Sequence, residues 1–94
     1  MKLISHRGNI DGKNVEKENT LPYINTALNS GYDVEIDVWY KEDKWYLGHD
    51  APQYNVNYLF LESISKHAWL HCKNLEALNE LDPLKYNFFL ASKR

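Results

Sequence analysis

The sequence predicts one α/β domain built from parallel βαβ units. The chain has 94 residues, which is enough for one small domain and too few for two. Hydrophobic residues make up 44% of the chain, as is typical of a globular protein. Segments with the two-residue period of a strand alternate with segments of helical period, and this order is typical of a parallel sheet covered by helices.

The first third of the chain predicts a strand, a loop and a helix. Residues 2–5 have the composition of a short strand, whereas residues 8–17 are polar and contain the turn formers of a loop. A helix is expected after Thr20, whose hydroxyl can cap the free amides of the first turn. Pro22 is tolerated in that first turn, and Gly31 ends the helix because it can take a positive φ.

The middle of the chain predicts a hairpin followed by a helix. Residues 33–40 alternate between apolar and polar side chains, as a strand with one buried face does. Residues 41–44 form a tight charged turn, and residues 45–47 return as the second strand of the hairpin. A loop is expected over residues 51–57 and a short helix over residues 58–66.

The last third predicts a strand, a helix and a final strand. Residues 68–73 are suited to a strand, and Asn74 can cap a helix that ends before Pro83. Residues 87–91 form the last expected strand. The predicted order is therefore strand, helix, strand, hairpin strand, helix, strand, helix, strand.

Charge and composition exclude several classes of protein. The formal net charge of −2 argues against a generic nucleic-acid binder, which normally carries a basic face. The single cysteine, Cys72, rules out an intramolecular disulfide and suits a reducing compartment. The first residues lack the apolar core of a signal peptide, and no segment is long enough to span a membrane. We therefore expect a cytoplasmic protein without nucleic-acid partners and without membrane insertion.

Ionisable side chains gather where the predicted strands end. The first strand ends at His6 and Arg7, the hairpin strand at His49, and the next strand at His71 and Lys73. In parallel α/β folds the functional groups collect at the carboxyl ends of the strands. These side chains are therefore candidates for one shared site.

Glu35 and Asp37 lie two residues apart on one strand, so their carboxylates project from the same face. Their mutual repulsion is relieved when a cation lies between them, and hard oxygen ligands of this kind suit Ca²⁺ or Mg²⁺. An exposed strand face with two solvated acids explains the same pattern. Taken alone, the pair fits the solvated face slightly better.

Of the histidines, only His6 and His49 lie at a predicted strand end and are followed by a charged residue. Two histidines on opposite sides of a phosphodiester can act as general base and general acid. Arg7 can hold the phosphate through a two-point contact, and Gly8 lets the backbone turn directly after it. Any one of these histidines is more often a surface residue or a core residue with satisfied hydrogen bonds, and it is the combination that favours a catalytic site.

Four short motifs, in this order and at these spacings, resemble the glycerophosphodiester phosphodiesterase family, whose members are barrels of the phosphatidylinositol-phospholipase-C type. Each motif is weak alone, but the series is specific and covers residues 6 to 50 densely. The motifs are His6-Arg7-Gly8, Glu18-Asn19-Thr20, Glu35-Ile36-Asp37-Val38 and Gly48-His49-Asp50.

The resemblance implies divalent-metal-dependent hydrolysis of a small phosphodiester, typically a glycerophosphodiester, to an alcohol and a phosphomonoester. In this family pattern His6 and His49 form the acid/base pair and Arg7 contacts the phosphate. Glu35 and Asp37 occupy the positions of metal ligands.

The resemblance also assigns the Glu18-Asn19-Thr20 motif. Glu18 faces the site, whereas Asn19 and Thr20 mainly order the loop and the first helix.

One position departs from the family pattern. His71 stands where the family has a third carboxylate ligand, whereas Lys73 fits the pattern and is expected to approach the phosphate. Imidazole is a poorer ligand than carboxylate for Mg²⁺ or Ca²⁺, the metals that the family resemblance favours, and a better one for Mn²⁺ or Zn²⁺. Either the metal preference has shifted toward Mn²⁺ or Zn²⁺ or the metal site has weakened.

The length of the chain limits the implied fold to about half of a TIM-like (β/α) barrel, because a complete barrel takes roughly 250 residues. Residues 1–94 are then one domain that corresponds to the N-terminal part of the family barrel. Such a half barrel leaves sheet edges unpaired. A truncated product, a short relative completed by a second copy and an open α/β sandwich all fit, and we favour the short relative that forms a homo-oligomer.

Two other functions stay open. His71 in place of an acid favours a catalytically inactive module that binds a phosphate or a sugar phosphate. A vestigial fragment without a site is the third reading, in which the aromatic residues serve an oligomer interface.

Overall fold

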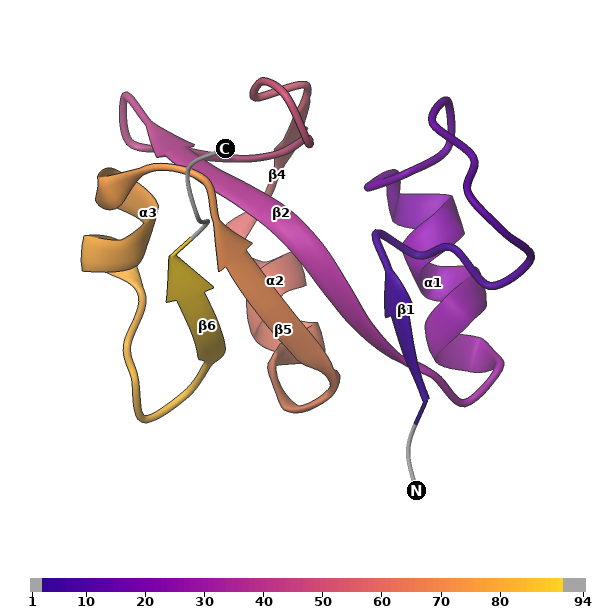
Figure 1. The fold of residues 1–94 in the computed structure, drawn as a ribbon. Coiled ribbons are helices and arrows are strands. Elements are labelled where there is room, and N and C mark those ends of the chain that lie inside the picture. Colours follow the sequence, from indigo (N-terminus) through magenta and orange to yellow (C-terminus); the bar gives the residue numbers. More distant parts are fainter. Residues whose placement is uncertain (1–2, 91–94) are drawn as a thin grey trace.

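The computed structural model describes residues 3–90, which form a six-stranded mixed sheet with three α-helices (Figure 1). The α/β class predicted from the sequence is therefore confirmed. In chain order the elements are β1 (Ile4–His6), α1 (Leu21–Asn29), β2 (Asp33–Lys41), β3 (Lys44–Leu47), β4 (Tyr54–Val56), α2 (Tyr58–Ile64), the short 3-10 helix η1 (Ser65–His67), β5 (Ala68–Cys72), α3 (Leu75–Glu80) and β6 (Asn87–Leu90).

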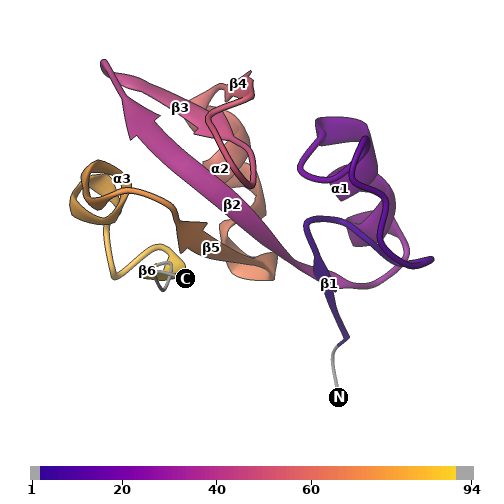
Figure 2. The ribbon, with the colours of Figure 1, turned by 45° about the horizontal axis from the view of Figure 1, so that its top comes forward.

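Strand β2 is the centre of the sheet. The strand order is β4-β3-β2-β5-β6, and β1 pairs with the first half of β2. The pairs β1–β2, β2–β5 and β5–β6 are parallel, whereas β3 and β4 run antiparallel to their neighbours. Because β5 occupies one edge of β2, β1 and β3 share the other edge, one beside each half of β2. Figure 2 shows β1 and α1 on one side of β2, and α3 and β6 on the other.

One face of the sheet carries the hydrophobic core. Val34, Ile36 and Val38 of β2 are fully buried, and their register partners Leu70 and Cys72 of β5 are buried beside them. Helix α2 lies behind this face in both views (Figures 1 and 2). Burial of each such aliphatic side chain stabilises the fold by about 1.5–3 kcal/mol. The strict alternation of β2 therefore fixes which of its residues face away from the core.

The opposite face of the sheet, here called the open face, carries Glu35, Asp37, Trp69, His71 and Phe89. The register pairs Glu35 with Trp69, Asp37 with His71 and His71 with Phe89. Trp69 and Phe89 keep 40% and 39% of their surface exposed. The polar residues of β2 thus lie on the face that the core leaves free.

Several predicted boundaries need correction. Strand β1 runs to His6, one residue further than predicted, and the predicted residue Lys2 lies outside the described residues. The predicted loop over residues 51–57 contains β4, which forms because it pairs with β3. The helix predicted over residues 58–66 ends as an α-helix at Ile64 and continues as η1. The last strand ends at Leu90, and Ala91 also lies outside the described residues.

The helix ends follow the prediction with one exception. Asn74 caps α3, since its Oδ1 accepts a hydrogen bond from the Ala77 amide at 3.1 Å. Gly31 follows the C-cap Ser30 of α1 and has a φ of +90°, as expected for a glycine that ends a helix. Thr20 occupies the N-cap of α1, but its hydroxyl donates to the Lys17 carbonyl at 2.7 Å and caps no amide. Within residues 3–90, no helix combines the length and apolar character needed to cross a membrane.

Candidate active site

His6 and Glu35 are brought together by the parallel pairing of β1 with β2. Their Cα atoms are register partners, and His6 Nδ1 lies 2.9 Å from Glu35 Oε1. The His6 side chain is 72% exposed, and Nε2 has no partner among residues 3–90. This contact orients the ring through Nδ1 and leaves Nε2 available to a ligand.

Asp37 is the centre of the site. Its side chain is only 2% exposed, and a buried carboxylate is stable only where donors or cations compensate it. Its Oδ2 accepts hydrogen bonds from Arg7 Nε at 2.9 Å and from Asn19 Nδ2 at 3.1 Å. His71 Nδ1 lies 3.1 Å from Oδ1, and His49 Nδ1 lies 3.6 Å from Oδ2. The structure therefore brings Arg7, His49 and His71 together around the buried Asp37.

The hairpin delivers His49 to Asp37. Strand β3 runs antiparallel to β2, so its end returns to the middle of β2, where the Gly48 amide donates to the Asp37 carbonyl at 3.1 Å. A Cβ on Gly48 would lie 1.9 Å from the Ala51 carbonyl oxygen, which requires glycine at this position. The buried His49 Nδ1 faces Asp37 Oδ2 at 3.6 Å and forms no hydrogen bond with any residue from 3 to 90, and leaving such an atom without a hydrogen bond costs about 1–3 kcal/mol.

Arg7 is held in one position by its backbone and by its side chain. Its φ of 56° lies in the left-handed region, and the following Gly8 has a φ of +88°. The Arg7 carbonyl accepts from the Asn19 amide at 3.0 Å. Its Nη1 lies 3.5 Å from Glu18 Oε1, and Nη2 has no partner in the described part of the chain. The guanidinium is therefore oriented before any ligand arrives.

Glu18 and Asn19 are buried beside Arg7. Glu18 accepts a hydrogen bond from Asn9 Nδ2 at 2.8 Å as well as the contact from Arg7. Asn19 contacts Asp37 directly and has a φ of 62°. The motif implied only that Asn19 orders the loop, whereas in the structure Asn19 also binds the central acid Asp37.

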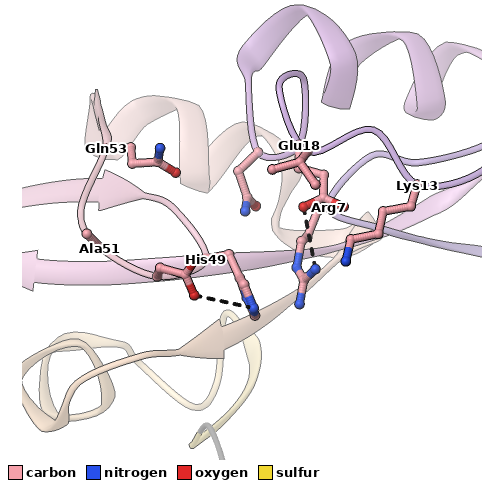
Figure 3. A pocket seen from close by; sticks show the side chains of 9 residues that line it. Arg7, Lys13, Glu18, His49, Ala51 and Gln53 are labelled. Carbon is pink, nitrogen blue, oxygen red and sulfur yellow. Dashed lines mark hydrogen bonds and ion pairs between the residues drawn. The ribbon is translucent and has the colours of Figure 1, made fainter.

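A cavity of about 210 Å³ lies beside the cluster, between the loop after β1 and the loop after β3 (Figure 3). Of the seven predicted site residues, Arg7 and His49 line it, and Lys13 is a lining cation that sequence reasoning missed. Lys13 lies between two of the motifs and belongs to neither, so no local sequence signal marked it as a site residue. The full lining is Arg7, Lys13, Val15, Glu18, Asn19, His49, Asp50, Ala51 and Gln53.

Lys73 does not join this cavity. Its amide donates to the Val38 carbonyl at 2.9 Å, at the end of β5. Its ammonium forms no ion pair with any residue from 3 to 90, and it is not part of the cavity lining. The expected approach of Lys73 to a bound phosphate therefore has no counterpart in the observed contacts.

The predicted metal ligands Glu35, Asp37 and His71 do not form a ready metal site. Glu35 is paired with His6, and both oxygens of Asp37 have partners. Residues 3–90 contain no group of three or more His, Cys, Asp and Glu side chains arranged to hold a metal ion. As the side chains stand, the three residues do not fit a divalent cation.

Cys72 lies beside His71 in the sequence but takes no part in the site. It is fully buried, as expected of a small apolar side chain, and burial raises the pKa of its thiol to about 11. Cys72 is therefore a protonated thiol at neutral pH that packs in the core as a small apolar side chain.

Comparison with known proteins finds no match to this chain among family models, curated proteins or solved structures. The resemblance to the glycerophosphodiester phosphodiesterases thus rests on the four sequence motifs alone.

Proposed function

We propose that this chain hydrolyses phosphodiesters of the glycerophosphodiester kind, with His6 and His49 as the general acid/base pair. One observation carries the proposal. Two acids on the same face of β2 each lie against a histidine from a different segment, with 2.9 Å between His6 and Glu35 and 3.6 Å between His49 and Asp37. A carboxylate at Nδ1 orients an imidazole and stabilises its protonated form.

Each imidazole makes one proton transfer, so the pair of histidines gains one proton from the water and loses one to the leaving alcohol. One histidine takes a proton from the water as the oxygen attacks phosphorus. The other gives a proton to the alcohol oxygen as the P–O bond breaks, so that the products are an alcohol and a phosphomonoester. Arg7, held by Asp37 and Glu18, donates from its unpartnered Nη2 to a phosphate oxygen.

The proposal extends to the fold, as about half of a (β/α)₈ barrel. Strands β1, β2, β5 and β6 are neighbours in parallel pairs, and helices α1, α2 and α3 lie in the successive connections. The β3–β4 hairpin is inserted after β2. The acids of β2 lie on the face away from the core, which would face inward if the sheet closed into a barrel.

A divalent cation enters this proposal only by displacing existing partners. Mg²⁺ or Ca²⁺ would take Glu35 and Asp37 from His6 and Arg7, and Mn²⁺ or Zn²⁺ would in addition use His71. Thermal unfolding in EDTA and then with each ion tests this. An ion that binds the folded state at a hundredfold excess over its dissociation constant adds about 2.7 kcal/mol, a rise of about 10–20 °C. If no ion raised the melting temperature, the proposed reaction would be acid–base hydrolysis without a metal.

A second candidate is a module that binds a phosphate or sugar phosphate without hydrolysing it. His71 favours this candidate, because a histidine stands where the family pattern has a third carboxylate ligand. In the structure this histidine contacts Oδ1 of Asp37. Calorimetry with glycerol phosphate, beside an assay for turnover, separates the two candidates. Binding without turnover supports the module, and turnover excludes it.

The test of the hydrolase is the hydrolysis of bis(p-nitrophenyl) phosphate by the wild type, His6→Ala and His49→Ala. General acid–base groups contribute about 10²–10⁴-fold, so each variant should lose at least about a hundredfold in kcat. His67→Ala is the matched control, since His67 is an exposed histidine paired with Asp33 and does not line the cavity. Unchanged turnover in both site variants would exclude the proposal.

A further inference from the structure

Lys13 lies at the wall of the cavity because the loop after β1 is folded by its own polar side chains. Asn9 Oδ1 accepts from the Asn14 amide at 3.1 Å, and Asn9 Nδ2 donates to Glu18 Oε2 at 2.8 Å. The Glu18 amide donates to the Asn14 carbonyl at 3.0 Å. These bonds tie both ends of the segment that carries Lys13 to the buried Glu18. In Figure 3 the Lys13 side chain runs toward the guanidinium of Arg7.

The charges around the cavity set Lys13 apart from Arg7. Asp37 and Glu18 both contact the Arg7 guanidinium and offset its charge. Asp50 adds a further acid to the lining. Lys13 forms no ion pair with any residue that the structure describes, so its charge is not offset by a neighbour. An anion near Arg7 alone would therefore meet more negative than positive charge.

We propose that Lys13 is a second cationic contact for the phosphate, which binds in the cavity between Lys13 and Arg7. Arg7 supplies directed hydrogen bonds from Nη2, but Asp37 and Glu18 offset its positive charge. Lys13 supplies a further positive charge for the phosphate. This inference rests on the proposed function, because it takes the ligand of Arg7 to be a phosphate group. It names a residue of the binding site that lies outside the four motifs.

The experiment compares two lysines of one loop. Lys13→Gln removes the cation at the cavity, and Lys17→Gln removes a cation that lines a different hollow with Pro22 and Tyr23. Both variants lower the net charge by the same amount. The probes are inorganic phosphate, measured by isothermal titration calorimetry, and bis(p-nitrophenyl) phosphate, measured through KM.

Lys13→Gln should weaken phosphate affinity and raise KM by about tenfold, the loss of one charge-assisted contact. Lys17→Gln should change both by less than about twofold, because an exposed charge outside the site acts only through screened long-range attraction. Lys13→Arg should restore most of the affinity, which separates a lost charge from a misfolded loop. Melting curves of all three variants accompany the binding data.

Equal effects of Lys13→Gln and Lys17→Gln would overturn the inference, and so would a wild-type chain that binds neither probe. These outcomes differ from failure of the hydrolase. His6→Ala and His49→Ala report on turnover, whereas the lysine variants report on affinity. A binding module without turnover would still show the difference between the two lysines.

Discussion

Asn19 and Asp37 hold one another through two hydrogen bonds across 18 residues of chain. Asn19 Nδ2 donates to Asp37 Oδ2 at 3.1 Å, and the Asp37 amide donates to Asn19 Oδ1 at 3.1 Å. The same asparagine donates from its own amide to the Arg7 carbonyl at 3.0 Å. One buried side chain thus fixes the rotamer of the central acid and the turn that carries the arginine.

Asn19→Ala should lower the free energy of unfolding by about 2–4 kcal/mol, because it removes two buried hydrogen bonds and places alanine at a positive φ. Urea unfolding measures this loss. Asn25→Ala on the exposed side of α1 is the control, with a change within about 0.5 kcal/mol. Glycine adopts the positive φ of this position freely, so Asn19→Gly removes only the side-chain hydrogen bonds. An Asn19→Gly variant as stable as the wild type would contradict a role for these bonds.

Gly48→Ala should destabilise the fold more than Gly12→Ala does. A Cβ at Gly48 would lie 1.9 Å from the Ala51 carbonyl oxygen, whereas a Cβ at Gly12 meets nothing within 4 Å. We expect a loss of about 1–2 kcal/mol at Gly12, from its φ of +93° alone, and at least about 1 kcal/mol more at Gly48.

Gly48→Ala should also lower turnover, because Gly48 precedes His49, whereas Gly12→Ala should not. Thermal unfolding together with the hydrolysis assay checks both. Equal stability and activity in the two variants would contradict the close packing at Gly48.

The stability of the chain should fall between about pH 9 and pH 11 in part through Cys72. Burial raises the pKa of this thiol from 9.0 to about 11. The folded state therefore holds its proton at a pH where the unfolded state has lost it, so the contribution is complete below pH 9 and is lost as the pH rises through 11. Urea unfolding at pH 7, 9 and 10.5 measures the decline.

Cys72→Ala is the control for this decline. Its stability at pH 7 is lower because the side chain is buried, but the fall toward pH 10.5 should be shallower than in the wild type. Burial also raises the pKa of Tyr86, so Tyr86 contributes to the loss of stability at high pH in both the wild type and the variant. The same slope in the two proteins would contradict the buried, protonated thiol.

The open face should promote self-association. Trp69 and Phe89 are large apolar side chains that stay partly exposed there. Sedimentation velocity between 1 and 100 µM should show a species heavier than a monomer in the wild type, and Trp69→Ser should shift it toward monomer. Leu84→Ser, at an exposed leucine after α3, should not. A wild type that is monomeric throughout this range would contradict the prediction.

Much of the local structure follows from residues that are close in sequence. The alternation of residues 33–40 predicts that Glu35 and Asp37 share one face of a strand, and Gly31 and Asn74 mark helix ends correctly. These features depend on the period of a single element and on the conformations open to single residues, which a sequence carries directly.

The sequence alone thus determined the class of the fold, the paired acids of β2 and the motifs that gather around them. The tertiary structure decided which partner each acid has: His6 for Glu35, and Arg7 and Asn19 for Asp37. It also placed Lys13 at the cavity and left Lys73 away from it. The physical reason is that these contacts join residues from different segments of the chain. They depend on strand register and loop conformation, which the period of a single element does not specify.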